Sequence, residues 1–513
     1  MSYFRNLARA TRGFSRALLG VPSGRGYDAS GYGRRLAAWV ETNSAINELL
    51  STEGEELRRR SRALVRKNGW ATSAQDSYVA NAVGTGIKPQ SLHPDEEIRK
   101  RIDKAWSISV DEFDSDGLTD FYGLEALALR EIFEGGEVLG RFRPRRSSDG
   151  LFVPLQLQLL EAEHLPLRYN TNNGNNPVRA GIEFTPWGKR EAYHMYSEHP
   201  GSGAMALTAD YGQLKRVPAS EVIHCFQPLR AGQYRGQPWL APVMVTLYEL
   251  DQFVDAVLVR QKLSNMFVGT QRLSNPDNQM FPEATGTGEI ADAGTQPSEV
   301  QPGTILDIGG DEMNWNDPPD PAATFPDFLK VMLHAFASGA GIPYELITWD
   351  LREVNYSSMR AALLEFRRRV EQLQFNVLAF QFCRPIWRRW INDAVLAGVL
   401  PRPQNAEGWR DLYSVEWRTP KWAWVDPLKD VQAAVTEIRN GLSSRTAKIH
   451  ETGYDPEQID RERAQDNARD DALGLVSDSD PRKTQKAAAP TAEKPSEPDE
   501  RETDDEATTA PRK

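Results

Sequence analysis

The longest regular pattern in this 513-residue sequence is a run of apolar residues spaced alternately four and three positions apart. It begins after Ser357 and continues to Arg384, and a helix of that length would span about 40 Å at roughly 1.5 Å per residue. The alternating spacing keeps one apolar stripe on one side of the helix. Pro385 lacks a backbone N–H, so it must disturb or end this segment before the chain continues to residue 401. The stripe comprises Met359, Leu363, Phe366, Val370, Leu373, Val377 and Phe380.

A stripe of this length requires a partner surface, because apolar side chains are stabilised when they leave water. The partner can lie in the same chain or in a neighbouring subunit, and the residues alone leave both possibilities open. Two shorter amphipathic helices are predicted at 239–263 and 325–340, where apolar residues again recur every three or four positions. Between them, the runs 266–270 and 303–308 are predicted to pair as strands, separated by a long polar insert that we expect to be mobile.

The rest of the chain predicts an α+β fold. Helical patterns come first, and alternating apolar residues then predict a mostly antiparallel sheet, including a hairpin whose turn is Pro186-Trp187-Gly188-Lys189. The further predicted segments are a mobile basic arm at 1–33, an aromatic run at 416–425 that pairs back onto the earlier sheet, short helices at 427–440 and 444–451, and a disordered tail at 471–513.

A net charge of −11 and a pI of about 5.4 argue against a dedicated nucleic-acid-binding protein, which usually has a basic domain with a pI above about 9. The arginine run at 58–62 could contact phosphate but is more typical of a solvated helix face. Cys225 and Cys383 are far apart, which argues against a disulfide framework and fits a reducing compartment. No apolar run approaches the roughly 20 residues that cross a bilayer, so we expect no membrane partner.

Three short motifs resemble ligand sites, but each lacks an essential part. Residues 83–87 carry two glycines of a nucleotide loop without the third glycine or a following Lys-Ser/Thr. Residues 112–117 begin like a calcium loop, but Gly123 stands where a bidentate Glu is required. Glu161 and Glu163 share one predicted strand face beside His164, but no further ligand follows at a suitable spacing. The sequence therefore predicts no catalytic residue, no metal site and no cofactor, and we do not expect an enzyme.

Several motifs around the long helix are similar to those of one known family. In chain order they are Val217-Pro218-Ala219, Val222-Ile223-His224, Arg235-Gly236-Gln237-Pro238-Trp239-Leu240-Ala241-Pro242, Gly341-Ile342-Pro343-Tyr344-Glu345-Leu346-Ile347 and Asn355-Tyr356-Ser357-Ser358-Met359-Arg360. In this order, and over roughly residues 34–467, the chain resembles the lambda-type family of tailed-bacteriophage portal proteins.

The resemblance implies a portal fold with an α/β wing, a helical stem, a small β-containing clip, a long kinked helix and a helical crown. It places the wing at 34–238 and the return to the wing at 402–426. It places the remaining parts in order as the first stem helix at 239–263, the clip at 264–324, the second stem helix at 325–340, the tunnel loop at 341–356, the long kinked helix at 357–401 and the crown at 427–470.

The resemblance also implies a function. We expect a homo-oligomeric ring, of twelve subunits in the family, at one vertex of the virion capsid, assembled in the host cytoplasm. Double-stranded DNA would pass through the ring during packaging and ejection. The expected partners are the large subunit of the terminase motor, the head-completion or connector protein, and the major capsid and scaffold proteins. The alternative is a scaffold or adaptor protein of the phage head that forms no ring.

Candidate site residues follow from the same resemblance. A ring of twelve chains would carry a net charge of 12 × −11, or −132, and would not hold DNA firmly. The tunnel-loop residues expected nearest the DNA are Trp349, Asp350, Arg352, Glu353 and Asn355, although Trp349 could instead fill a subunit interface and Arg352 could pair locally with Glu353. The residues expected to line the stem are Asp251, Asp255, Lys262 and Lys330. The residues expected to pack between subunits are Leu363, Phe366, Val370, Leu373 and Val377.

Overall fold

The computed structural model describes residues 43–202, 213–272, 304–306, 312–315, 325–352, 355–420, 427–451 and 456–475. The chain divides into two compact units, 1–420 and 421–513. The predicted basic arm at 1–33, the polar insert at 273–303 and the tail after residue 475 lie outside the described residues.

Helices form the N-terminal part of the first unit. The side-chain oxygen of Asn68 accepts the N–H groups of Trp70 and Ala71 and begins the second of these helices. The last of them is begun by Asp120 and is ended by Gly136, which has a left-handed φ of 88° that suits glycine. These helices are α2 (Ile46–Lys67), α3 (Gly69–Ala82), α4 (Glu96–Ser109) and α5 (Phe121–Gly135).

Two sheets follow, one with the strand order β3-β2-β9 and the other with the order β4-β5-β6-β7-β8. Every neighbouring pair in them is antiparallel, as the sequence predicts. Leu139, Ile182 and Tyr193 belong to one buried cluster that joins the two sheets. The strands are β2 (Glu137–Pro144), β3 (Leu155–Glu161), β4 (Thr171–Asn173), β5 (Asn176–Arg179), β6 (Ile182–Phe184), β7 (Arg190–Met195), β8 (Lys215–Pro218) and β9 (Val222–Phe226).

The predicted return of the chain after residue 401 does not join either of these sheets. It consists of α12 (Ala406–Tyr413) and β13 (Val415–Arg418), and β13 pairs antiparallel with β1 (Lys88–Ser91) as a separate two-stranded sheet. Trp417 of β13 is buried, and its ring centroid lies 6.2 Å from that of Trp387.

The long helix differs in detail from the prediction. It comprises α10 (Tyr356–Leu373), a π-helix η10 (Gln374–Cys383) and α11 (Arg384–Leu396), which follow one another without a break. Pro385 lies in the first turn of α11, where its missing N–H is tolerated. The disturbance that Pro385 predicts therefore lies on its N-terminal side, in the wider π-helical turns. There the Arg384 N–H bonds to the Ala379 carbonyl, five residues earlier.

An aromatic core joins this long helix to the N-terminal helices. The ring centroid of Trp106 in α4 lies 5.0 Å from that of Phe121 in α5 and 5.0 Å from that of Trp390 in α11. Trp387 and Trp390 are fully buried. One edge of the long helix is thus part of the core of the first unit.

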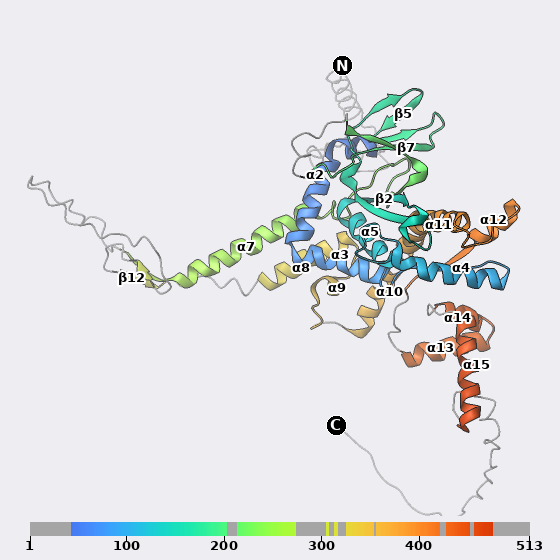
Figure 1. The fold of residues 1–513 in the computed structure, drawn as a ribbon. Helices are drawn as coiled ribbons and strands as arrows, with labels where there is room; N and C mark the ends of the chain where they lie inside the picture. The colour runs from blue at the N-terminus through green and yellow to red at the C-terminus, as the bar shows by residue number, and fades with distance from the viewer. Residues whose placement is uncertain are drawn as a thin grey trace, which may run out of the picture. The chain divides into compact units, whose positions relative to one another are not determined.

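The segment between the sheets and the long helix forms a helical arm (Figure 1). α7 (Met244–Met266) extends from the core, β10 follows it, and α8 (Phe325–Ala340) packs against α7 over the residues that were predicted to be helical. α9 lies inside the segment that was predicted to be a loop. β10 pairs with β11, as the sequence predicts, and the structure adds that this pair is parallel and that β10 also pairs antiparallel with β12. These elements are β10 (Phe267–Arg272), β11 (Thr304–Leu306), β12 (Glu312–Trp315) and α9 (Tyr344–Thr348).

The described part of the second unit is helical, as the sequence predicts, with α13 (Pro427–Arg439), α14 (Arg445–Glu451) and α15 (Pro456–Leu473). α15 extends to Leu473, so the prediction that the helices end at residue 470 is three residues short. Among the described residues of both units, no helix has the length and apolarity required to cross a membrane.

Candidate functional site

The helical arm is anchored in the core at one end and solvent-exposed at the other. Leu247 and Leu250 of α7 are buried, whereas the residues from Asp251 to Lys262 are exposed or half-buried. The Phe253 ring lies 6.0 Å from that of Phe325 and 4.9 Å from that of Phe328, which joins α7 to α8. The arm therefore has one packed seam, and its further faces are exposed among the residues that the structure describes.

Large apolar side chains are exposed on the arm, on the loop after α9 and on the long helix. Trp349 is 74% exposed and Val331 is 65% exposed. Large exposed apolar patches mark interaction sites, and of the elements that carry these side chains α7 packs on α8 and α8 packs on α9. We refer to these residues as the exposed apolar set, and they are Val245, Tyr248, Leu258, Val259, Val331, Trp349, Leu351, Leu364, Phe375 and Phe380.

The predicted tunnel-loop residues lie between α9 and α10. Trp349 has a positive φ of 56°, which is strained for a bulky residue, and its side chain is presented to solvent. The Asp350 carboxylate accepts bonds of 2.8 Å from both Nε and Nη2 of Arg352. Asn355 caps α10 by accepting the Ser357 N–H. Glu353 lies outside the described residues, so its predicted pairing with Arg352 stays a prediction.

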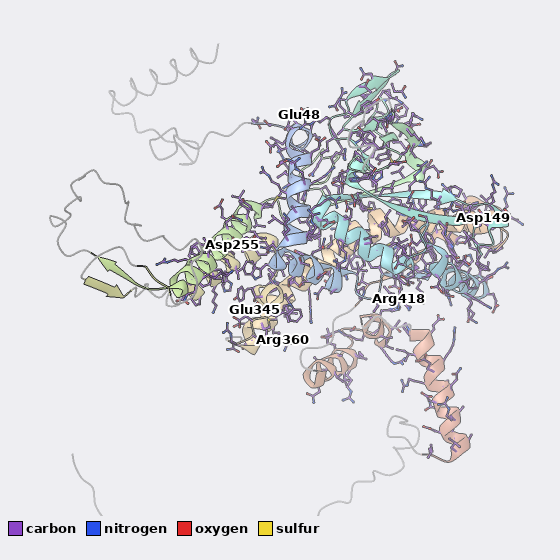
Figure 2. The ribbon with its side chains drawn as sticks, turned by 60° about the vertical axis from the view of Figure 1, so that its left-hand side comes forward. Glu48, Asp149, Asp255, Glu345, Arg360 and Arg418 are labelled. Carbon is purple, nitrogen blue, oxygen red and sulfur yellow. The ribbon has the colours of Figure 1, made fainter. Side chains whose placement is uncertain are left out.

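Two of the predicted stem residues have contacts that place them. Asp251 accepts a 3.3 Å bond from the Asn68 side chain, so its carboxylate lies against the start of α3. Arg352 lowers the pKa of Asp350 below its usual value, and Lys330 of α8 adds to this effect. The structure therefore brings the predicted stem residue Lys330 close to the predicted tunnel-loop residue Asp350. Asp255 is exposed on the outer part of α7 (Figure 2). Lys262, seven residues further along the same helix, is also exposed.

Four of the five predicted subunit-packing residues lie in the core of the chain itself. Phe366, Val370, Leu373 and Val377 are all buried within the first unit, and the Phe366 ring lies 5.5 Å from that of Tyr78 in α3. A side chain that is already covered by its own chain cannot gain burial from a neighbour. We therefore reassign these four to the core. The fifth, Leu363, is half-buried.

A cleft of about 560 Å³ lies beside this buried stripe. It is bounded by the chain leading into α7, by the end of α8 and by the long helix, and its lining includes Trp239, Gly341, Arg369 and Gln381. Gln381 bonds through its side chain to both backbone groups of Phe226 in β9. The cleft is thus located where the arm, the β3-β2-β9 sheet and the π-helix meet.

A buried ionic cluster holds the base of the arm. The carboxylate of Glu137, the first residue of β2, is completely buried. It accepts bonds of 2.5 Å from Arg58 Nη2, 2.8 Å and 2.5 Å from Arg235 Nε and Nη2, and 2.6 Å from the Gly236 N–H. It also lies 3.0 Å from His224 Nε2. The cluster joins α2, β2, β9 and the chain that enters α7.

Two guanidinium groups keep the buried Glu137 carboxylate ionised. Burial alone would raise the pKa of Glu137, but Arg235 and Arg58 outweigh it and hold the pKa well below its usual value. Burial lowers the pKa of His224 to about 4, so its ring is neutral and donates the Nε2–H to Glu137. His224 lies within one of the motifs that carry the family resemblance, and its contacts are structural.

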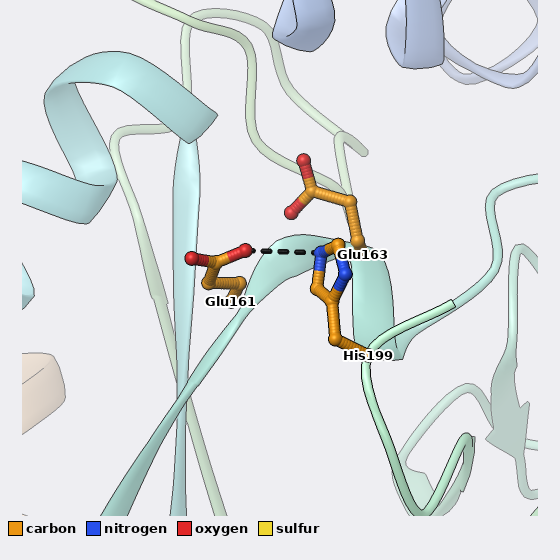
Figure 3. A group of neighbouring side chains, drawn as sticks. All are labelled: Glu161, Glu163 and His199. Atoms are coloured by element: carbon orange, nitrogen blue, oxygen red, sulfur yellow. Dashed lines mark ion pairs between the residues drawn. The ribbon is translucent and has the colours of Figure 1, made fainter. Parts of the chain in front are cut away.

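A second cluster tests the weak metal-site motif. Arg62 binds both oxygens of Glu163, at 2.9 Å and 2.8 Å, and also bonds to Glu131 and Glu134. His199, from a distant part of the sequence, approaches Glu161 with Nε2 at 3.0 Å (Figure 3). Oxygen and nitrogen atoms of Glu161, Glu163 and His199 lie within 4.8 Å of one another.

This second cluster fits an arginine better than a metal ion. Both Glu163 oxygens are occupied by Arg62, so a cation would have to displace a guanidinium that four glutamates surround. His164, the predicted third member, instead has its Nδ1 3.2 Å from the Glu161 carbonyl. The prediction that 58–62 is a solvated helix face is wrong for Arg58 and Arg62, whose partners lie inside the first unit.

Sequence reasoning missed the glutamates that hold these arginines. Glu131 and Glu134 are three residues apart in α5 and Glu137 follows at the start of β2, but acidic spacing of this kind is also typical of a solvated helix face. The arginine run gave the matching signal, since Arg58 and Arg62 are four residues apart and share one helix face. That spacing predicts that both reach the same side, but not that the side is buried.

Comparison with known proteins agrees with the motifs. The model of the family described as phage portal protein, lambda family, matches residues 32–374. The probable portal protein of Halomonas phage phiHAP-1 is 26% identical over 454 residues, covering 85% of each chain. Portal protein B of Escherichia phage lambda is 23% identical over 491 residues, covering 87% of this chain and 90% of the relative.

Solved structures resemble the chain more distantly. A chain from the neck of a native GTA particle is 14% identical, covers 78% of this chain and 94% of its own length, and has a TM-score of 0.43. Among the relatives found by sequence, the portal protein of Escherichia phage N15 is 24% identical over 484 residues, covering 87% of this chain and 90% of the relative. Because the family model spans more than half of the sequence, the chain belongs to the lambda family of phage portal proteins.

Proposed function

We propose that copies of this chain form a closed ring at one vertex of a phage capsid, and that double-stranded DNA passes through the ring during packaging and ejection. The observation that carries this proposal is the exposed apolar set on the arm, the loop after α9 and the long helix. Membership of the portal family supports the proposal, in which this surface would supply the faces through which neighbouring copies meet.

The magnitude of this burial is sufficient for association. Full burial of one large apolar side chain contributes about 1.5–3 kcal/mol. The lost translational and rotational freedom costs roughly 4–15 kcal/mol for each association. Partial burial of the exposed apolar set therefore offsets that cost, and a ring repeats the same contact at every subunit.

The acidic balance of the chain suits a conduit. Each Lys or Arg that neutralises a phosphate adds to a salt-dependent affinity, which would slow the passage of DNA. At −11 per chain, a ring would bind DNA weakly. We propose that the exposed Asp255 and Lys262 of α7 line the channel, and that Trp349, Asp350 and Arg352 lie at its narrowest part.

The same proposal assigns the partners. The end of the arm, with β10, β11 and β12, would contact the terminase large subunit and later the head-completion or connector protein. The sheets would contact the major capsid and scaffold proteins. The protein would reside in the virion after assembly in the host cytoplasm, and we assign it a structural role without catalysis or a cofactor.

Passage of DNA through the assembled particle tests the proposal directly. Purified particles are seated in a solid-state pore, and a voltage drives either linear or closed circular duplex DNA of equal length through them. The proposal predicts transient current blockades with linear DNA. With circular DNA, it predicts no blockade that ends in passage of the DNA. Equal behaviour of the two forms, or no blockade with linear DNA, would contradict a conduit and favour an adaptor that forms no ring.

A further inference from the structure

The β2–β3 hairpin carries a row of three arginines. Arg141 and Arg143 lie at alternate positions of β2, and Arg145 directly follows that strand. Alternate residues of a strand face the same side, at a spacing of about 6.8 Å, so the three guanidinium groups share one face. Leu139, two residues before Arg141 on the same face, is buried between the two sheets. The arginine row therefore begins where the buried part of this face ends.

Two of these arginines are held by neutral partners. Arg143 donates from Nε and Nη2 to the Gln158 side-chain oxygen at 3.0 Å and 2.5 Å, and Arg145 donates from Nε to that of Gln156 at 2.7 Å. Among the residues that the structure describes, no carboxylate lies within 4.0 Å of the guanidinium nitrogens of Arg141, Arg143 or Arg145.

The row is therefore a local excess of positive charge on an acidic protein. Partial burial lowers the pKa of Arg143, and the charges of Arg141 and Arg145 lower it further, which shows that the three groups feel one another. By contrast, the partly buried Arg62 is surrounded by the carboxylates of four glutamates. Like charges on one face destabilise a sheet unless an anion lies between them.

We propose that the arginine row on the β2–β3 hairpin is a docking surface for an extended acidic segment of a partner protein. Carboxylates at alternate positions of an extended chain repeat every 6.8 Å or so, the same spacing as the arginines. Each guanidinium keeps N–H groups that the glutamines do not use, and these can bind a carboxylate. The inference does not depend on ring formation.

Two observations favour a protein partner over a nucleic acid. The net charge of −11 opposes the approach of a polymer as highly charged as DNA, and three phosphate contacts would contribute little against that field. Exposed apolar side chains also border the hairpin. Phe152 lies in its loop, and Leu118 lies in the segment after Asp114, whose carbonyl accepts a hydrogen bond from Gln156 of β3. A protein segment would cover these side chains, whereas phosphates would not. Figure 2 labels Asp149 at the exposed tip of the hairpin.

The test measures binding of a fluorescein-labelled peptide of six Glu-Thr repeats to the full-length protein by fluorescence anisotropy at low salt. Charged hydrogen bonds of this kind are worth about 1.5 kcal/mol or more, so the triple variant R141Q/R143Q/R145Q should bind at least about tenfold more weakly. The matched control R59Q/R60Q/R66Q removes three exposed arginines of α2 and changes the net charge equally, from −11 to −14. It should bind within about twofold of the unaltered protein.

Other outcomes would overturn the proposal. Equal losses in the two triple variants would show a non-specific charge effect. Tighter binding of a 12-nucleotide single strand or a DNA duplex, lost in R141Q/R143Q/R145Q, would identify a nucleic-acid site instead. If the peptide does not bind and R141Q/R143Q/R145Q alters the particle mass, the occupant is a second copy of this chain. If the triple variant fails to fold, R145Q alone, at an exposed position, should still weaken peptide binding about threefold, and unchanged binding would refute the proposal.

Discussion

Replacement of Glu137 by Gln removes the charge at the base of the helical arm while keeping the shape of the side chain. The two guanidinium groups of Arg58 and Arg235 would remain buried, at 2% and 1% exposure, without a counter-ion. The Gln amide would also place N–H donors against the N–H donors of an arginine. Removal of one partner from a buried ion pair costs about 3–5 kcal/mol. We therefore expect E137Q to lower the free energy of unfolding by about this amount.

The assay is urea denaturation followed by tryptophan fluorescence, at one fixed protein concentration because assembly also contributes to stability. Glu56 supplies the matched control, since it too pairs with two arginines, Arg59 and Arg60, but on the exposed surface of α2. Surface ion pairs contribute about 0–1 kcal/mol, so E56Q should have a small effect.

Two results would refute this reasoning. A loss below about 1 kcal/mol in E137Q would show that the cluster does not stabilise the fold. Equal losses in E137Q and E56Q would show that burial does not decide the outcome. Hydrogen exchange adds a spatial criterion, because the amides of β2, β9 and the start of α7 should lose protection first.

Three further predictions concern other parts of the chain. Burial raises the pKa of Glu125 to about 8, so between pH 4.5 and 8 the folded state binds more protons than the unfolded state, and the free energy of unfolding falls as pH rises. E125Q should flatten this fall, measured by urea titrations at pH 5 and pH 8.5. An unchanged dependence on pH would exclude Glu125 as its source. A Cβ at Gly86, which has a φ of 102°, would lie 2.3 Å from the Tyr122 ring, so G86A should lower the free energy of unfolding by more than about 2 kcal/mol. G117A, at a position with a positive φ but open space, should lower it by only about 1 kcal/mol. Equal losses of stability in thermal melts of the two variants would contradict the steric argument. V331E should reduce the particle mass in sedimentation, while L127E, at an exposed position of α5 that lies outside the exposed apolar set, should not; retention of full mass by V331E would remove α8 from the subunit contact.

The sequence predicted those elements whose pattern is local. The helix at 325–340 follows from one amphipathic stripe, and the hairpin between β6 and β7 follows from its Pro-Trp-Gly-Lys turn. The π-helix was not predictable, because a period of three and four is equally compatible with α-helical turns. Its register is set by partners such as Gln374, whose side chain bonds to the Ala82 carbonyl almost 300 residues earlier.

The direction in which a stripe faces also could not be read from the sequence. Phe366 and Val370 were equally suited to a neighbouring subunit and to the same chain, and the structure buries them against α3. The buried ion pairs of Glu137 could not be predicted for a similar reason, since its partners come from α2, β9 and the chain before α7. Contacts between distant segments depend on the fold as a whole, and local spacing carries no record of them.

Formation of a ring is tested most directly by electron microscopy of the purified full-length protein together with its native mass. The account predicts particles with rotational symmetry, a central hole wide enough for a DNA duplex, and a mass near twelve times the chain mass of 57.6 kDa. A uniform monomer or dimer that persists at high protein concentration would contradict it. The exposed apolar set would then need a different partner, and the non-ring adaptor would become the better description.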